Sequence, residues 1–95
     1  SSMDSLRDMA DQMKEQLNSA IIVLGAVHEG KVLLIASVTK DLIDKGLHAG
    51  KIIKQIAPIC GGGGGGRPDM AQAGGKNPDK LDEALGEAAK IISQI

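Results

Sequence analysis

The chain has 95 residues, a length that fits one domain with one small hydrophobic core. It contains no Phe, Tyr or Trp, one cysteine and two histidines, so an internal disulfide is excluded and no zinc site is expected. The formal net charge of −1 selects no class of partner, and the longest apolar run is far too short to cross a bilayer. Because the sequence also shows no signal-peptide pattern, we expect a reduced, cytoplasmic protein.

The first predicted element is an amphipathic helix over residues 4–17. Its apolar stripe recurs at steps of three and four residues, at Leu6, Met9, Met13 and Leu17. Two interpretations stay open: the helix folds back on its own domain, or it is the end of a longer helical segment used for self-association. We predict an N-terminal helical segment over residues 1–19 and a globular domain over residues 20–95.

A β-hairpin follows, with strands predicted over residues 20–27 and 32–38. Both segments are rich in β-branched residues, and Glu29 and Gly30 stand at the centre of a tight turn between them. Apolar side chains alternate onto both faces of each strand. We therefore expect other elements to cover the sheet on both sides.

Two further helices and a third strand complete the predicted fold. A second amphipathic helix is expected over residues 51–59, a short strand over residues 69–73, and a last helix from Asn77 onward. The sequence thus predicts an α+β domain: a small mixed sheet with a β-hairpin, two or three packed helices and a Gly-rich loop, preceded by an N-terminal helix.

The most distinctive segment is the run of six glycines from Gly61 to Gly66, which leaves a line of bare backbone N–H groups. A flexible linker is disfavoured because too few residues follow it to form a second domain. A close structural crossing and an anion cradle beside Arg67 and Lys76 both stay open, as does a required loop that also presents a nucleic-acid surface. The segment matches neither a P-loop nor a dinucleotide-binding fingerprint.

Several separated blocks of the sequence resemble the C-terminal domain of bacterial alanyl-tRNA synthetases, which belongs to the wider DHHA1 group. They are residues 61–75, 38–42, 46–51 and 80–85. The resemblance implies a non-catalytic module of an ATP-dependent alanine–tRNA ligase that contacts the outer corner of tRNA, where the D- and T-loops meet. It implies contacts with the other synthetase domains, no cofactor in this domain and, as the alternative function, oligomerisation through the helical segment.

The same group includes phosphoesterases, in which a Gly-rich motif ending in His-x-x-Ala-Ala-Gly binds a substrate phosphate. Arg67 stands where that histidine would lie, and extra residues precede Gly74 and Gly75. The sequence has no counterpart of the metal-binding Asp-His-His domain. We therefore expect neither catalytic residues nor metal ligands.

The predicted RNA-binding residues lie in the basic middle of the chain. Residues 20–77 carry seven basic and four acidic side chains, whereas residues 1–19 and 78–95 each carry two basic and four acidic ones. The predicted set is Arg67, Lys51, Lys54, Lys40, Lys76, His48, Gly64, Gly65, Gly66 and Gln72.

Each of these side chains also has a structural interpretation. The guanidinium of Arg67 suits a phosphate or a base face, but Asp69 could instead pair with it. The lysines could contact phosphate or remain solvated, and His48 could donate to phosphate or hold its turn.

Met70 and Gln72 alternate on the short strand, and we expect one to face the core and the other to reach RNA. Cys60 is expected to be buried packing. Because no aromatic ring is available to stack on bases, recognition should depend on RNA shape and phosphate.

Overall fold

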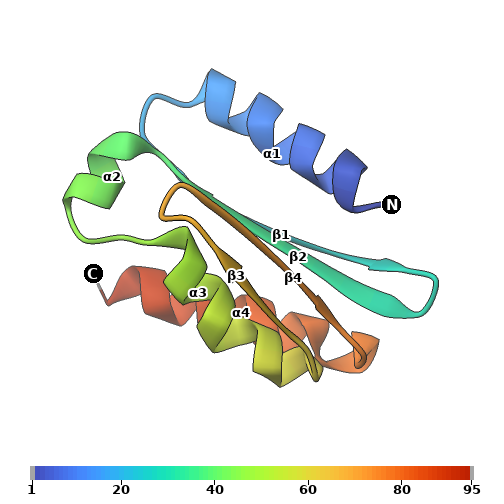
Figure 1. Ribbon diagram of the computed structural model, residues 1–95. Helices are drawn as coiled ribbons and strands as arrows, with labels where there is room; N and C mark the ends of the chain where they lie inside the picture. Colours follow the sequence, from blue (N-terminus) through green and yellow to red (C-terminus); the bar gives the residue numbers. More distant parts are fainter. Residues whose placement is uncertain (1, 95) are drawn as a thin grey trace.

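The computed structural model describes residues 2–94, which form a four-stranded antiparallel sheet between helices (Figure 1). Helix α1 (Met3–Gln16) covers one face, and α3 (Ala49–Ile56) and α4 (Leu81–Ser93) cover the other. The strands are β1 (Ile21–His28), β2 (Lys31–Val38), β3 (Gly63–Gly66) and β4 (Met70–Gly75). Their spatial order, β1-β2-β4-β3, places β1 and β3 at the two edges of the sheet.

The predicted hairpin is confirmed. Strands β1 and β2 pair along their whole length, from Ile21 opposite Val38 to His28 opposite Lys31. Glu29 (φ 52°) and Gly30 (φ 76°) both adopt the left-handed region that a two-residue type I′ turn requires.

Both faces of strand β2 are buried, as the sequence predicts, but this creates two apolar cores where one was expected. Val32, Leu34, Ala36 and Val38 pack with the isoleucines of α3 and the alanines of β4 and α4. On the opposite face, Leu6 and Ala10 of α1 pack against Ile22 and Ile35 and form the smaller of the two cores, which we call the small core. Helix α1 therefore lies folded back on the sheet, while the division of the chain at residue 19 stays a prediction.

The α+β class and the N-terminal helix are confirmed, but two details of the predicted sheet were wrong. The sheet is antiparallel throughout rather than mixed. Four of the six glycines form a strand, β3, where a loop was predicted. A three-residue turn reverses the chain directly into β4, closed by the bond from Arg67 N–H to the Met70 carbonyl (2.9 Å), so β3 and β4 must run antiparallel.

The remaining helices are short. Helix α2 (Lys40–Asp44) follows β2, and 3₁₀ turns η1 (Ala57–Cys60) and η2 (Pro78–Lys80) follow α3 and precede α4. The predicted second helix gives way to η1 at Ala57 because Pro58 has no N–H to continue an α-helix. Within residues 2–94, no helix is long and apolar enough to span a bilayer.

Candidate nucleic-acid interface

Strand β3 runs so close to β4 that side chains are excluded at alternate positions. A Cβ added to Gly64 would lie 2.5 Å from the Ala73 Cβ, and one added to Gly66 would lie 2.8 Å from the Ala71 Cα. Real Cβ atoms essentially never approach closer than 3.0 Å. A Cβ at Gly63, by contrast, would meet nothing within 4 Å. At these alternate positions, at least, glycine is required because the chain crosses close to itself, which is one of the interpretations that the sequence left open.

The start of α3 lies against the end of β3. A Cβ added to Gly50 would lie 2.6 Å from the Gly66 carbonyl oxygen. The N–H groups of Ala49 and Gly50 donate to the carbonyl oxygens of Pro68 (2.8 Å) and Arg67 (3.2 Å). Contacts inside the protein thus occupy the first two N–H groups of α3, which a bound phosphate would otherwise use.

His48 is the N-cap residue of α3. Its Nδ1 accepts the N–H of Lys51 at 3.2 Å, and its carbonyl oxygen accepts the N–H of Ile52. His48 therefore holds its turn, which is the structural role predicted for it, and only its Nε2 is left to contact a ligand.

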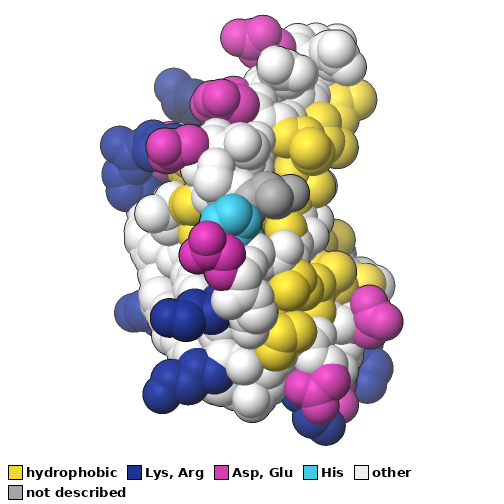
Figure 2. Space-filling model, turned by 90° about the vertical axis from the view of Figure 1, so that its right-hand side faces the viewer, with side chains coloured by type: hydrophobic (Ala, Val, Ile, Leu, Met, Phe, Trp, Pro, Cys, Tyr) yellow, Lys and Arg dark blue, Asp and Glu magenta, His cyan; other side chains and the backbone are white. Residues whose placement is uncertain are grey.

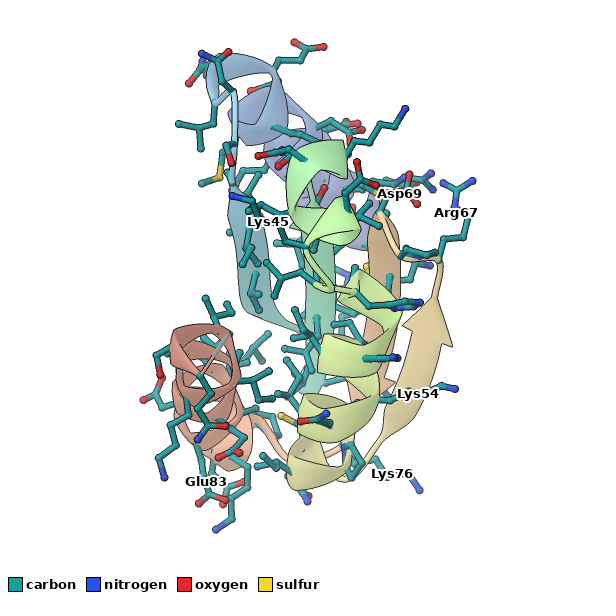
Figure 3. All side chains as sticks on the ribbon, turned by 90° about the vertical axis from the view of Figure 1, so that its left-hand side faces the viewer. Lys45, Lys54, Arg67, Asp69, Lys76 and Glu83 are labelled. Atoms are coloured by element: carbon teal, nitrogen blue, oxygen red, sulfur yellow. The ribbon has the colours of Figure 1, made fainter. Side chains whose placement is uncertain are left out.

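Cationic side chains follow the length of β3. Figure 3 shows Arg67, Lys54 and Lys76 projecting from the same side of the molecule, at successive heights along this strand. A Cβ at Gly65 would lie 3.4 Å from Lys54 Cε, so the aliphatic part of Lys54 lies over the bare strand. Lys51 is exposed one turn earlier on α3. These four cations, all members of the predicted RNA-binding set, thus lie on elements that border β3.

Two open hollows lie at opposite ends of β3. The first, between α1 and the β3–β4 pair, measures about 180 Å³ and is lined by Arg7, Gly65, Gly66, Arg67, Met70, Ala71 and Gln72. The second measures about 380 Å³ and is lined by Lys31, Gly61, Gly62, Gly74, Gly75 and Lys76. We call them the Arg7 hollow and the Lys31 hollow. Each is lined by two cationic side chains and by glycines: Gly65 and Gly66 in the Arg7 hollow, and four glycines in the Lys31 hollow.

Arg67 pairs with Asp69, as one of its two predicted roles requires, and its guanidinium stays exposed to solvent, as the other role requires. Its Nε lies 3.4 Å from Asp69 Oδ1, and both side chains are exposed. An exposed pair of this kind contributes little to stability. Arg67 also lines the Arg7 hollow, and its guanidinium is exposed enough to meet a second anion.

Met70 and Gln72 point the same way, because residues two apart on a strand share a face. Met70 packs against the small core beneath α1, whereas Gln72 is exposed and pairs in register with Gly65. The predicted alternation between faces is therefore wrong, whereas the packing of one of the two side chains in a core is confirmed, because α1 covers Met70 and not Gln72. A contact of Gln72 with RNA stays a prediction.

The structure adds two cations that the sequence reasoning missed. Arg7 of α1 and Lys31 of β2 each line a hollow, whereas three lysines of the predicted set, Lys40, Lys51 and Lys54, line neither. Lys31 and Lys76 line the same hollow because their neighbours in sequence, Val32 and Gly75, pair in register between β2 and β4. No local sequence pattern marks either residue, because each joins its hollow through contacts between elements far apart in the chain.

The opposite, β1 side of the molecule is apolar. Among residues 2–94, the large apolar side chains most exposed to solvent are Met9, Met13, Leu17 and Val27, at 51%, 38%, 46% and 47%. Met9 lies two residues, or about 200°, beyond Arg7 on α1 and so faces away from β3. Figure 2 shows most Lys and Arg side chains on one half of the hairpin end of the molecule and most hydrophobic side chains on the other.

Two titrating groups have shifted pKa values, and both have structural roles. Burial, with a smaller contribution from Glu83, raises the pKa of the Cys60 thiol. Cys60 is fully buried in the core, which confirms its predicted role in packing. The hydroxyls of Ser19 (2.5 Å) and Thr39 (2.6 Å) donate to Asp41 and lower the pKa of its carboxyl. Residues 2–94 hold no group of three or more side chains suited to a metal ion.

Comparison with known proteins gives a consistent set of relatives. A family model described as the DHHA1 domain matches residues 1–94. Alanine–tRNA ligases of Bacillus velezensis and Bacillus subtilis are 63% and 61% identical over 93 residues, which is 98% of this chain but only 11% of each ligase. The crystal structure of the C-Ala domain from Aquifex aeolicus alanyl-tRNA synthetase matches with a TM-score of 0.89 at 32% identity, covering 98% of this chain and 83% of that one.

Proposed function

The chain belongs to the DHHA1 family and, within it, to the C-Ala domains of alanyl-tRNA synthetases, and from this we propose that it is a non-catalytic tRNA-binding module of a cytoplasmic alanine–tRNA ligase. Its partners would be the outer corner of tRNA and the other domains of the ligase. Since the chain spans 11% of the length of these ligases, we assign aminoacylation and editing to the remainder.

The observation that carries this proposal is the cationic surface along β3. We define the glycine edge as β3 together with the four cations around it, Lys31, Lys54, Arg67 and Lys76. A strand without side chains lets a sugar–phosphate backbone approach closely, and an edge strand directs unpaired N–H groups outward. The lysines and the arginine add charge along that path, so the surface suits a polyanion.

The composition decides how RNA would be recognised on this surface. Single-stranded nucleic acids are usually held by stacking on aromatic rings, and this chain has none. Contacts to phosphate and to the shape of a folded RNA remain. The glycine edge is therefore suited to a feature that many tRNAs share, and we expect affinity without strong sequence specificity.

The test is tRNA binding by the 95-residue chain across a salt series. We expect Lys54→Ala with Arg67→Ala to weaken binding and to reduce the slope of log K against log salt by about 0.7–0.9 for each phosphate that is no longer neutralised. The matched control, Lys45→Ala with Lys90→Ala, removes the same charge from α2's C-cap and from α4. Binding that does not depend on salt, or equal losses of affinity for the two pairs, would refute the surface assignment.

A second candidate function, oligomerisation, is favoured by the exposed methionines of α1. Met9 and Met13 lie outside the small core while Leu6 and Ala10 fill it. Sedimentation across a concentration series, for the chain and for Met9→Ser with Met13→Ser, separates this function from RNA binding. A monomer at every concentration in the unaltered chain would remove it.

A further inference from the structure

We propose that α1 is part of the RNA-binding surface. In this proposal Arg7 and Arg67 bind the phosphate of one nucleotide of the bound RNA from opposite rims of the Arg7 hollow. The amide of Gln72 hydrogen-bonds to the edge of the base of that nucleotide. The inference rests on the proposed function and deepens it, because it brings in a helix that is otherwise only packing. It also assigns a residue that lies more than 50 positions from the glycine run in sequence.

The packing of α1 fixes the position of Arg7. Leu6 and Ala10, one residue before it and three after it, are 4% and 0% exposed and pack against Ile22 and Ile35. The backbone of Arg7 therefore cannot move away from the sheet without opening the small core. Its side chain is exposed and lines the hollow together with Arg67, which projects from the turn between β3 and β4.

The lining of the hollow suits one nucleotide of a polymer. Two guanidinium groups offer planar forks that match phosphate oxygens. Gly65 and Gly66 have no side chain to hold a ligand away from the backbone. Gln72 carries an amide, both donor and acceptor, which matches the mixed groups of a base edge, and Met70 adds apolar contact.

The size of the hollow favours a polymer over a free small molecule. Its volume of about 180 Å³ is below the roughly 300–1,000 Å³ of pockets that enclose small ligands. The hollow is also open, so much of any ligand would stay outside it. A nucleotide that is held elsewhere by the glycine edge does not need full enclosure.

Acidic side chains confine the RNA to this hollow. Asp4, Asp8, Asp11 and Glu15 recur at steps of four and three residues and form a stripe on α1 beyond Arg7. A phosphate on the outer face of α1 would meet these carboxylates and be repelled. The cationic rim of the helix, on the side of the glycine edge, is the part that an RNA strand can approach.

The test compares Arg7→Ala with Lys14→Ala in tRNA binding by the 95-residue chain. Lys14 lies two turns along the same helix, carries the same charge and does not line the hollow. We expect Arg7→Ala to weaken binding about tenfold and Lys14→Ala less than about twofold, with Arg7→Lys in between because charge is kept and the fork is removed. Unchanged thermal melting of Arg7→Lys separates a binding loss from a folding loss.

A direct readout accompanies the variants. The Nε–H resonances of Arg7 and Arg67 should both shift when tRNA is titrated into the labelled chain, and adenosine monophosphate should not saturate the hollow. If tRNA binds and the Arg7 resonance stays fixed, or if Arg7→Ala matches Lys14→Ala, this inference is wrong while the proposed function stands. Saturable binding of the mononucleotide would make the hollow a small-molecule site and also overturn it. If the unaltered chain does not bind tRNA at any salt concentration, both proposals fail.

Discussion

The two edges of the sheet differ in nearly every property that matters for binding. At the glycine edge, β3 has no side chains, and it is surrounded by three lysines and one arginine from α3, β2 and the adjoining turns. At the other edge, β1 is rich in β-branched and other apolar residues and lies beside the exposed methionines of α1. We call this second surface, formed by β1 with Met9, Met13, Leu17 and Val27, the apolar edge.

The contrast shows how one small domain can separate two kinds of contact. Helix α1 borders both surfaces, with Arg7 toward the glycine edge and Met9 toward the apolar edge. A polyanion gains from the first surface and not from the second. A protein partner would gain apolar burial on the second and would meet scattered charge on the first. RNA binding and self-association therefore predict that different edges are occupied.

The largest expected effect concerns the backbone of the glycine edge. Gly64→Ala should lower the free energy of unfolding by about 1–3 kcal/mol, because its Cβ would collide with Ala73 across the strand pair. Gly63→Ala, one residue earlier, should be neutral or stabilising by up to about 1 kcal/mol, since its Cβ meets nothing within 4 Å. Urea denaturation measures both, and equal destabilisation at the two positions would show that the strand pairing is not as described.

The next effect concerns the Lys31 hollow. Lys31→Ala with Lys76→Ala should weaken tRNA binding and lower the salt slope by about 0.7–0.9 for each phosphate that these lysines neutralise. Fluorescence anisotropy at several salt concentrations measures the slope directly. An unchanged slope would mean that the bound RNA contacts β3 only at its end near Arg67.

A smaller effect, on stability, concerns the hydrogen bonds at the start of β1. Thr39 Oγ1 accepts the N–H of Ala20 and donates to Asp41, which also accepts from Ser19. Since folding lowers the pKa of Asp41, its stabilisation is present above the ordinary pKa of an aspartate and is lost as pH falls through the lowered one. Asp41→Asn should slightly lower the melting temperature at neutral pH, and the difference should vanish in acid. A difference that grows as pH falls would contradict the assigned hydrogen bonds.

The smallest expected effect comes from one added charge near the end of β1. Val27→Lys places a positive charge beside His28, which pairs with Lys31 of the Lys31 hollow. Because this position is on the margin of the glycine edge and salt screens the added charge, we expect tRNA binding to tighten by no more than about twofold at physiological salt. Tightening as large as the loss from the Lys54 and Arg67 variants would indicate diffuse attraction instead of a defined surface.

Local sequence patterns predicted most of the fold. The hairpin and the helices follow from periodicity and turn residues that act over a few positions, as with Glu29 and Gly30. Strand β3 could not be predicted this way, because glycine is depleted in strands and has no side chain to pack. Its pairing with β4 depends instead on the turn over residues 67–69 and on the close approach that only glycine permits.

The candidate surface was predictable to the extent that its residues cluster in sequence. Arg67 and Lys76 flank β4, and Lys54 shares a face of α3 with Lys51, so the basic middle of the chain identified them. Arg7 and Lys31 join the same surface only through the packing of α1 and the pairing of β2 with β4. Contacts between elements far apart in the chain leave no local sequence pattern. The charge count also pointed away from Arg7, because it lies in the acidic segment over residues 1–19.

The central claim is that tRNA binds at the glycine edge, and amide chemical-shift mapping of the labelled chain with tRNA tests it most directly. We predict that the largest shifts fall on Gly63–Gly66, Lys54, Arg67 and Lys76, and that the amides of β1 stay near their free positions. Shifts concentrated on β1, Met9 and Met13, with β3 unchanged, would contradict the account.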